Sequence, residues 1–307
     1  MRRVGLIGVP SSAGAHWPGQ EKAPGALRAA GLVTRLETAG CRVVDHGDLP
    51  RVRFQPDPEH RRAQNLGAVV AVARSVAEGV ETALRADETP LVVGGDCTIT
   101  VGAVAGVLGY TADLALLYFD GGVDLYTPVT NPEGILDSMG VAHLLGEPGA
   151  AEELSRLGPR HPLLTEDRIV YFGQDQGEPD DPESVVLARR SMYRYPAERV
   201  RGRPRAAADE ALGYLEGLAG RFLVHFDVDA IDFVDFPAAD VPQFNTGLTF
   251  AEAMESLGVL AASPRFGGLV VTEFNPDHAD EEGALAAALA QGIADVMALG
   301  RGDAGLR

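Results

Sequence analysis

Strand-length apolar runs alternate with longer helical patterns along this chain of 307 residues. The runs are nearly continuous, which is typical of strands that are covered on both faces. The clearest candidate strands are residues 4–9, 42–45, 90–93, 114–119, 168–172, 222–226 and 268–273. Helical patterns separate them, among them residues 23–38, 61–85, 204–218, 249–261 and a last one from about 281 to 299. The alternation predicts an α/β fold, a three-layer αβα sandwich around a mostly parallel sheet of about eight strands.

Domain boundaries are not evident in the sequence. It has no fixed-period repeat and no linker-like segment, so we expect one domain over residues 1–307. Residues 51–58 and 175–182 are polar and contain proline, which predicts surface loops. Residues 232–249 mix aspartates and prolines with small and aromatic residues. A loop of that length is uncommon unless it builds a site.

The charge and the cysteine content limit the partners and the compartment. The formal net charge is −18 and the isoelectric point is near 4.7, which makes nucleic acid and anionic membranes poor partners. Two cysteines, Cys41 and Cys97, do not form a disulfide framework. The first apolar run ends at Pro10 and is too short to span a membrane. We therefore expect a cytoplasmic protein.

Acidic residues occur where the predicted strands end. Those at the ends of the strands are Asp96, Asp120, Asp227 and Glu273, while Asp124 and Asp229 follow shortly after. In an open parallel sheet, ligands bind beyond the carboxyl ends of the strands. Each pair of carboxylates in contact there costs on the order of 4 kcal/mol at an effective dielectric near 20. A single such aspartate is explained as a helix cap, but four with this spacing favour a metal site, for which oxygen donors suit Mn²⁺.

Motifs spread along nearly the whole chain resemble those of the arginase/agmatinase (ureohydrolase) family. They are residues 5–10, 22–28 and 45–49, Gly94-Gly95-Asp96-Cys97, residues 120–124, residues 225–232 and Glu273-Phe274-Asn275-Pro276. The resemblance implies manganese-dependent hydrolysis of a guanidinium or a related amidine. In that chemistry a hydroxide bridging two Mn²⁺ ions attacks the central carbon and releases urea or a similar small amide.

The resemblance also implies a ligand set. One ion would be bound by Cys97, Asp120, Asp124 and Asp227, and the other by Asp120, Asp227 and Asp229. Glu273 matches the acid that pairs with the cationic head of the substrate. The histidine expected for the second ion is replaced by Gly122, so that ion lacks a ligand.

For two residues, Cys97 and His225, the sequence allows both a metal-binding role and a structural role. Cys97 stands where the family has histidine: it is either a thiolate ligand, which would favour Zn²⁺ or Fe²⁺, or a packing residue. His225 replaces a serine and lies on the same strand face as Asp227 and Asp229. It is either a ligand or a core histidine bonded to an aspartate. One ion, two ions and none are therefore all open.

The segment that would contact the substrate also departs from the family. The family's proton-shuttling histidine aligns with Asp137, and the residues that hold an amino acid's carboxylate align with Glu133 and Ile135. Tyr126 stands at another polar carboxylate contact. Acids at this rim repel a carboxylate, which argues against free L-arginine and leaves a decarboxylated or larger cationic guanidine. Glu133 is alternatively a solvated loop acid.

Three functional hypotheses follow. The first is a hydrolase of a guanidino or amidino compound, in a role such as specialised metabolism. The second is a pseudoenzyme that keeps the fold as a binding partner, and the third uses the pocket for non-hydrolytic chemistry. The retained acids favour the first, since their repulsion costs stability without a cation. The resemblance further implies a homo-oligomer, a trimer or a hexamer.

Overall fold

The computed structural model describes residues 1–300 apart from 176, 178 and 281. Its centre is one sheet of eight strands in the order β2-β1-β3-β8-β7-β4-β5-β6, and all neighbouring strands are parallel. The strands are β1 (Arg3–Gly8), β2 (Arg42–Asp48), β3 (Thr89–Val93), β4 (Leu114–Phe119), β5 (Ile169–Phe172), β6 (Tyr193–Tyr195), β7 (Arg221–Asp227) and β8 (Phe266–Thr272). The predicted α/β class and the number of strands are confirmed.

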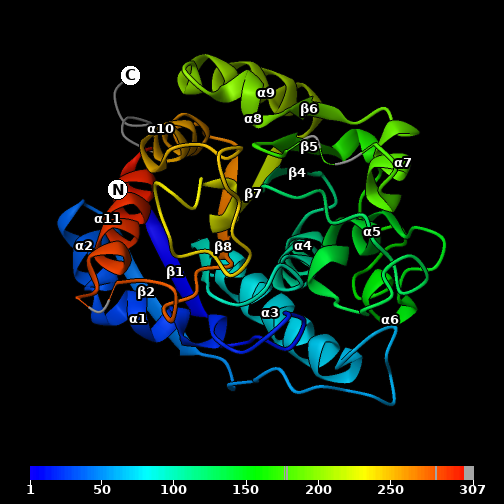
Figure 1. The fold of residues 1–307 in the computed structure, drawn as a ribbon. Helices are drawn as coiled ribbons and strands as arrows, with labels where there is room; N and C mark the ends of the chain where they lie inside the picture. Colours follow the sequence, from blue (N-terminus) through cyan, green and yellow to red (C-terminus); the bar gives the residue numbers. More distant parts are fainter. Residues whose placement is uncertain (176, 178, 281, 301–307) are drawn as a thin grey trace.

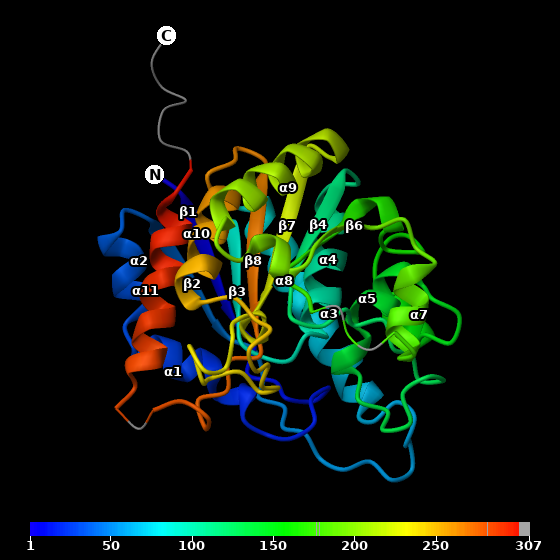
Figure 2. The same cartoon turned by 45° about the horizontal axis from the view of Figure 1, so that its top comes forward.

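Helices cover both faces of the sheet (Figures 1 and 2). On one face lie α1 (Ala23–Ala29), α2 (Leu32–Thr38), α9 (Pro204–Leu218), α10 (Phe250–Ala261) and α11 (Ala284–Ala298). On the other lie α3 (Leu66–Arg85), α4 (Ile99–Tyr110), α5 (Gly140–Leu145) and α6 (Glu152–Ser155). The short helices α7 (Pro182–Ala188) and α8 (Ala197–Val200) flank the β5–β6 edge.

Two apolar cores form because successive strand residues point to opposite faces. In β4, Leu117 and Phe119 pack in one core, while Leu116 and Tyr118 pack in the other. All of β4 is buried, as expected from its unbroken apolar sequence. The sheet is therefore the middle layer of the predicted sandwich.

Several predicted bounds need correction. The helix predicted over residues 23–38 is two helices, because Gly31 adopts a left-handed conformation (φ 83°) between them. The helix predicted from residue 61 begins at Leu66, and the last strand ends at Thr272. The predicted start of the last helix, Glu281, lies outside the described residues, as do 176 and 178 of the predicted loop 175–182; α11 begins at Ala284.

The strand ends create the place for a site. Because the strands are parallel, the segments that follow β3, β4, β7 and β8 leave the sheet at the same edge, near its middle. The loop of residues 232–249 lies at this end (lower in Figure 2) and contributes Val241 and Gln243 to a cavity there. Within the described part of the chain, no helix is both long enough and apolar enough to cross a membrane.

Candidate metal centre

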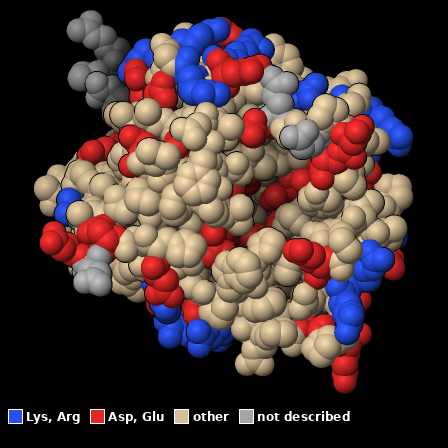
Figure 3. Space-filling view, in the orientation of Figure 1, with Lys and Arg blue, Asp and Glu red and all other residues tan. Residues whose placement is uncertain are grey.

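A cavity of about 150 Å³ lies at the carboxyl ends of the central strands. Seven acids line it: Asp120, Asp124, Asp137, Glu183, Asp227, Asp229 and Glu273. Cys97 and His16 also line it, and no lysine or arginine does so among the described residues. Figure 3 shows acidic side chains around the hollow near the middle of this face. Such a cavity attracts cations and repels anions.

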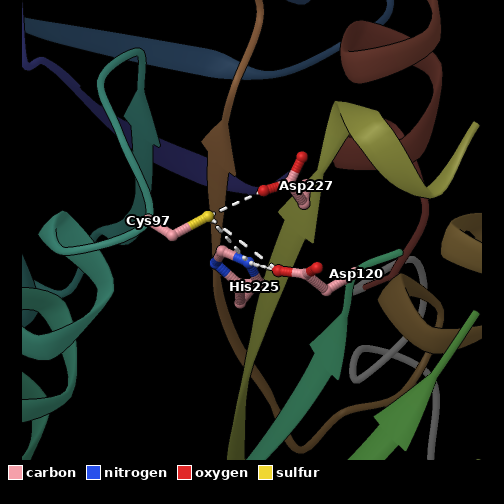
Figure 4. Close-up of side chains that lie close together, drawn as sticks. All are labelled: Cys97, Asp120, His225 and Asp227. Atoms are coloured by element: carbon pink, nitrogen blue, oxygen red, sulfur yellow. Dashed lines mark hydrogen bonds and ion pairs between the residues drawn. The ribbon is translucent and has the colours of Figure 1, made fainter. Parts of the chain in front are cut away.

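Four potential ligands form one compact group beside the cavity (Figure 4). They are Sγ of Cys97, a carboxylate oxygen each of Asp120 and Asp227, and a ring nitrogen of His225, all within 4.8 Å of one another. Three of these residues line the cavity, whereas His225 is fully buried and does not. Sγ of Cys97 lies 2.7 Å from Oδ2 of Asp227 and 3.7 Å from Nε2 of His225. Nε2 of His225 lies 3.1 Å from Oδ2 of Asp120. All four residues are buried.

The orientation of His225 is set from two sides. Its Nδ1 lies 2.7 Å from Oγ1 of Thr100, in the first turn of α4. Its ring stacks on that of Tyr118 with centroids 4.0 Å apart and planes 10° apart. These contacts direct Nε2 toward Asp120 and Cys97 (Figure 4). Both interpretations of His225, a ligand and a histidine bonded to an aspartate, agree with this position.

Asp124 and Asp229 line the cavity but lie outside the compact group. Oδ2 of Asp124 accepts a hydrogen bond from the Tyr118 hydroxyl. Oδ1 of Asp229, in the short 3₁₀ helix that follows β7, accepts one from the backbone N–H of Gly121 at 3.0 Å. Each of these aspartates therefore already has one oxygen engaged by the protein.

Gly122 marks where a further ligand could have been. A Cβ built on Gly122 would lie 3.3 Å from Oδ1 of Asp120 and 3.7 Å from Oδ1 of Asp124. A side chain at this position would thus extend beside these two carboxylates. Glycine contributes only its backbone N–H, which donates to Oδ1 of Asp120 at 2.6 Å.

A second group joins Cys97 to Asp137 and Glu273, again within 4.8 Å. Oδ1 of Asp137 accepts a hydrogen bond of 2.6 Å from the backbone N–H of Cys97. Oε2 of Glu273 accepts one from the side-chain amide of Gln20, whereas Oε1 is buried and has no hydrogen-bond partner in the structure. A buried carboxylate oxygen without a donor is costly, so this wall is suited to a ligand that carries N–H donors or positive charge.

Burial disfavours the charged forms of these acids. Loss of hydration, followed by the neighbouring carboxylates, raises the pKa of Asp124 and Glu273 well above their usual range. The same causes raise the pKa of Asp229 to about 8, and burial raises that of Glu183 to about 8. Burial also raises the pKa of the Cys97 thiol, and the charge of Asp227 raises it further. A divalent cation would reverse these shifts by favouring the charged forms.

The donor chemistry fits a metal ion at the first group. Sulfur, imidazole nitrogen and two carboxylate oxygens are an accepted ligand set for Zn²⁺ and related ions. The unpartnered Oε1 of Glu273 lies in the other group and fits an organic cation instead. Binding of an ion by Cys97, Asp120, Asp124, His225, Asp227 or Asp229 stays a prediction.

The predicted substrate-binding residues lie at different depths. Tyr126 lines an adjoining cavity of about 230 Å³, which shares Gly122, Glu183 and Gln243 with the acidic cavity. Glu133 is 69% exposed at its side chain, 3.9 Å from His16 at the rim. Exposure agrees with the interpretation of Glu133 as a solvated loop acid, although its charge still faces an approaching ligand.

Four contributors were not anticipated from the sequence: Gln20, Thr100, Tyr118 and Glu183. Thr100 follows Cys97 by three residues at the start of α4. Tyr118 precedes Asp120 by two residues and packs in the apolar core on the α3–α6 side of the sheet. Such spacing is too common to single out a site. Glu183 is brought in by α7, and its Oε1 accepts hydrogen bonds from the backbone N–H groups of Leu125 and Tyr126. No local signal joins it to Asp124.

Comparisons with known proteins agree with the fold. A family model described as "Arginase family" matches residues 2–298. The chain is 28% identical over 297 residues to the arginase of Bacillus caldovelox, with 94% of this chain and 97% of that one covered. It is 30% identical over 278 residues to arginase-1 of Homo sapiens, with 90% and 85% covered. The crystal structure of arginase from Bacillus cereus superposes with a TM-score of 0.86 at 26% identity, covering 97% of this chain and 98% of that one.

Proposed function

Because this chain belongs to the arginase family, we propose that it is a metal-dependent hydrolase. It would cleave a C–N bond of a guanidino or amidino compound other than free L-arginine, and thus act on linear amidines. The proposal is supported above all by the cavity, where seven acids meet without a lysine or an arginine among the described residues. Such a cluster is costly unless protons or a cation neutralise it, and a cation allows the acids to stay charged.

The first group supports the metal-binding part of the proposal. Asp120 and Asp227 approach Cys97 and His225 from the ends of neighbouring strands, which fixes them to a rigid sheet. Asp124 and Asp229 lie beside them on the cavity wall, as expected for further ligands or for groups that bind metal-bound water. A metal ion bound here would supply an activated water and positive charge for the tetrahedral intermediate.

The second group supports the binding of a cationic head. Glu273 presents an unpartnered Oε1, and Asp137 lies close enough for both carboxylates to contact one planar cation. We assign Glu273 to hold and orient the guanidinium or amidinium. We assign Asp137 to exchange protons with the substrate nitrogen, a role that needs a carboxyl group within hydrogen-bond reach of the reacting group.

The rim supports the exclusion of free L-arginine. Tyr126 and Glu133 lie on the way to the acidic cavity, and Tyr126 is already bonded to the carboxylate of Asp181. A free amino acid would bring its own carboxylate toward these acids, which is unfavourable. A small cationic substrate without a carboxylate avoids this repulsion.

Several broader features belong to the same proposal. We infer a cytoplasmic enzyme of one domain over residues 1–307 that forms a homo-oligomer, a trimer or a hexamer, as the resemblance to the family implies. A role in specialised metabolism would accommodate the changed residues. Neither nucleic acid nor a membrane is expected as a partner of so acidic a chain.

The test is a screen of guanidino and amidino compounds for the release of urea or a small amide. The protein is stripped of metal and assayed alone and with Mn²⁺, Zn²⁺ or Fe²⁺. We expect turnover that requires metal and is lost in Asp227→Asn. Metal binding without release of any such product would favour non-hydrolytic chemistry, and absence of both metal binding and turnover would favour a pseudoenzyme.

A further inference from the structure

We propose that this chain binds one ion rather than two, and that the ion is of the zinc type, held by Cys97, Asp120, His225 and Asp227. The inference rests on the proposed function only in taking this cavity as the metal site. It replaces the two-manganese arrangement that the family resemblance implies with a single site whose ligands include sulfur and nitrogen.

The spacing of the ligand atoms fits one tetrahedral ion. With bonds of about 2.0–2.3 Å, the ligands of such an ion lie roughly 3.2–3.8 Å apart. Sγ of Cys97 lies 3.7 Å from Nε2 of His225 and 3.9 Å from Oδ2 of Asp120. Nε2 of His225 and Oδ2 of Asp120 are 3.1 Å apart. The 3.1 Å and 3.9 Å distances lie just outside this range, whereas the 2.7 Å between Cys97 and Asp227 is well below it. Asp227 therefore has to move away from the sulfur by roughly 1 Å to complete the tetrahedron.

His225 is oriented as metal-binding histidines usually are. Such a histidine holds its other ring nitrogen in a hydrogen bond, which fixes the ring and its tautomer. Here Oγ1 of Thr100 lies 2.7 Å from Nδ1, and the ring of Tyr118 holds the imidazole plane. If Nδ1 donates to Thr100, the free electron pair of Nε2 points into the group of acids. A cation between Nε2 and Asp120 would then satisfy both.

The ligand types decide which ion is preferred. Thiolate and imidazole favour Zn²⁺ and Fe²⁺, whereas sites made only of carboxylates favour Mn²⁺ or Mg²⁺. Cys97 is 3% exposed and lies between β3 and α4, where its sulfur faces the other three ligand atoms. The change to sulfur and nitrogen therefore shifts the site away from manganese.

The chain lacks ligands for a second ion. Gly122 offers no side chain beside Asp120 and Asp124. Asp124 accepts a hydrogen bond from the Tyr118 hydroxyl, and Asp229 accepts one from the backbone N–H of Gly121. Neither aspartate belongs to a compact ligand group in the described part of the chain. Beyond the shared Asp120 and Asp227, a second ion would have only the one remaining oxygen each of Asp124 and Asp229, and no side chain at position 122.

Metal content and spectroscopy together test the proposal. The stripped full-length protein is reconstituted separately with Zn²⁺ and with Co²⁺, dialysed, and analysed for metal per chain. We expect about one ion per chain for each metal, and a near-ultraviolet thiolate-to-cobalt charge-transfer band in the Co²⁺ form. Cys97→Ser should lose the band, and His225→Gln should weaken Zn²⁺ binding by at least about tenfold. Cys41→Ser is the matched control, because Cys41 is also buried but packs in an apolar core and does not line the acidic cavity.

Each outcome separates this inference from the proposed function. Two ions per chain, or one ion without the sulfur band in the unmodified protein, would overturn the inference and leave the metal-dependent hydrolase standing. A band that survives Cys97→Ser would remove Cys97 from the ligands and overturn it as well. No bound ion of any kind would overturn both. The band of the unmodified protein does not depend on whether the variants fold.

Discussion

Sγ of Cys97 and Nε2 of His225 lie 3.7 Å apart, although 128 positions separate the two residues in the chain. Cys97 follows β3 and His225 lies in β7, with β8 between these strands. The parallel sheet thus places the two unusual residues next to the carboxylates of Asp120 and Asp227. This contact gives a physical basis for treating both changes as parts of one site.

Thr100 should tune the metal affinity through His225. In Thr100→Val the hydrogen bond to Nδ1 is lost, while the volume of the side chain is kept. We expect Zn²⁺ affinity to fall by about 10- to 100-fold, measured by competition with a chelator. Thr100→Ser keeps a hydroxyl and should restore most of the affinity. Equal affinities in Thr100→Val and the unmodified protein would contradict the role of His225 as a ligand.

Gly122→His should create a second metal position. Gly122 has no positive φ, and a Cβ added to it would lie 3.3 Å from Oδ1 of Asp120, so a side chain fits once that carboxylate shifts slightly. The imidazole would extend beside Asp120 and Asp124. We expect metal content to rise from about one to about two ions per chain. Gly122→Ala adds the Cβ without a ligand and should leave the content unchanged; a rise in Gly122→Ala would contradict this explanation.

A carboxylate on the substrate should be penalised. The acidic cavity and Glu133 at its rim repel an anionic group. If the screen finds turnover of simple guanidines, decarboxylated arginine should exceed free L-arginine in kcat/KM by at least about tenfold, or roughly 1.4 kcal/mol. Glu133→Gln should lower this ratio of the two kcat/KM values. A preference for L-arginine would show that the rim acids do not select the substrate.

Glu183 should make the stability of the metal-free protein depend on pH. Its pKa is raised to about 8 by burial, against about 4.3 in an unfolded chain. The folded state therefore binds more protons than the unfolded state between these values, so stability falls as pH rises from about 4 to about 8. Glu183→Gln keeps the acceptor for Leu125 and Tyr126 and should reduce this loss by roughly 1 to 3 kcal/mol.

Urea unfolding of the metal-free protein at a series of pH values measures this effect. Glu153→Gln serves as the control, because Glu153 is exposed on α6 and does not line the acidic cavity. Its profile should follow that of the unmodified protein. A parallel profile for Glu183→Gln would mean that Glu183 is charged in the folded protein across this range.

The layers of the fold were predictable because strands buried on both faces are continuous apolar runs in the sequence. Residues 114–119 were predicted with the bounds that the structure gives to β4. β6 was not predicted, because it has only three residues, two of them exposed, and lies at the edge of the sheet. α4 was also not predicted: it is apolar on all sides and buried, so its sequence has no helical periodicity to detect.

The site was predictable only as far as strand ends define it. Asp120 directly follows β4, Asp227 ends β7 and Cys97 lies in the short segment between β3 and α4, so a parallel sheet had to bring them to one edge. Which of them share one compact group depends on side-chain direction, which the spacing does not give. The separation of Asp124 from that group results from its bond to Tyr118, and the presence of Glu183 results from where α7 packs.

Metal content after dialysis tests the central claim most directly, because every role given to these acids requires a cation. The stripped protein is dialysed against about 0.1 mM Zn²⁺, then against metal-free buffer, and metal per chain is counted. We expect about one ion per chain in the unmodified protein and clear loss of the ion in Asp227→Asn. Less than about half an ion per chain with Zn²⁺, Mn²⁺ and Fe²⁺ alike would contradict the account.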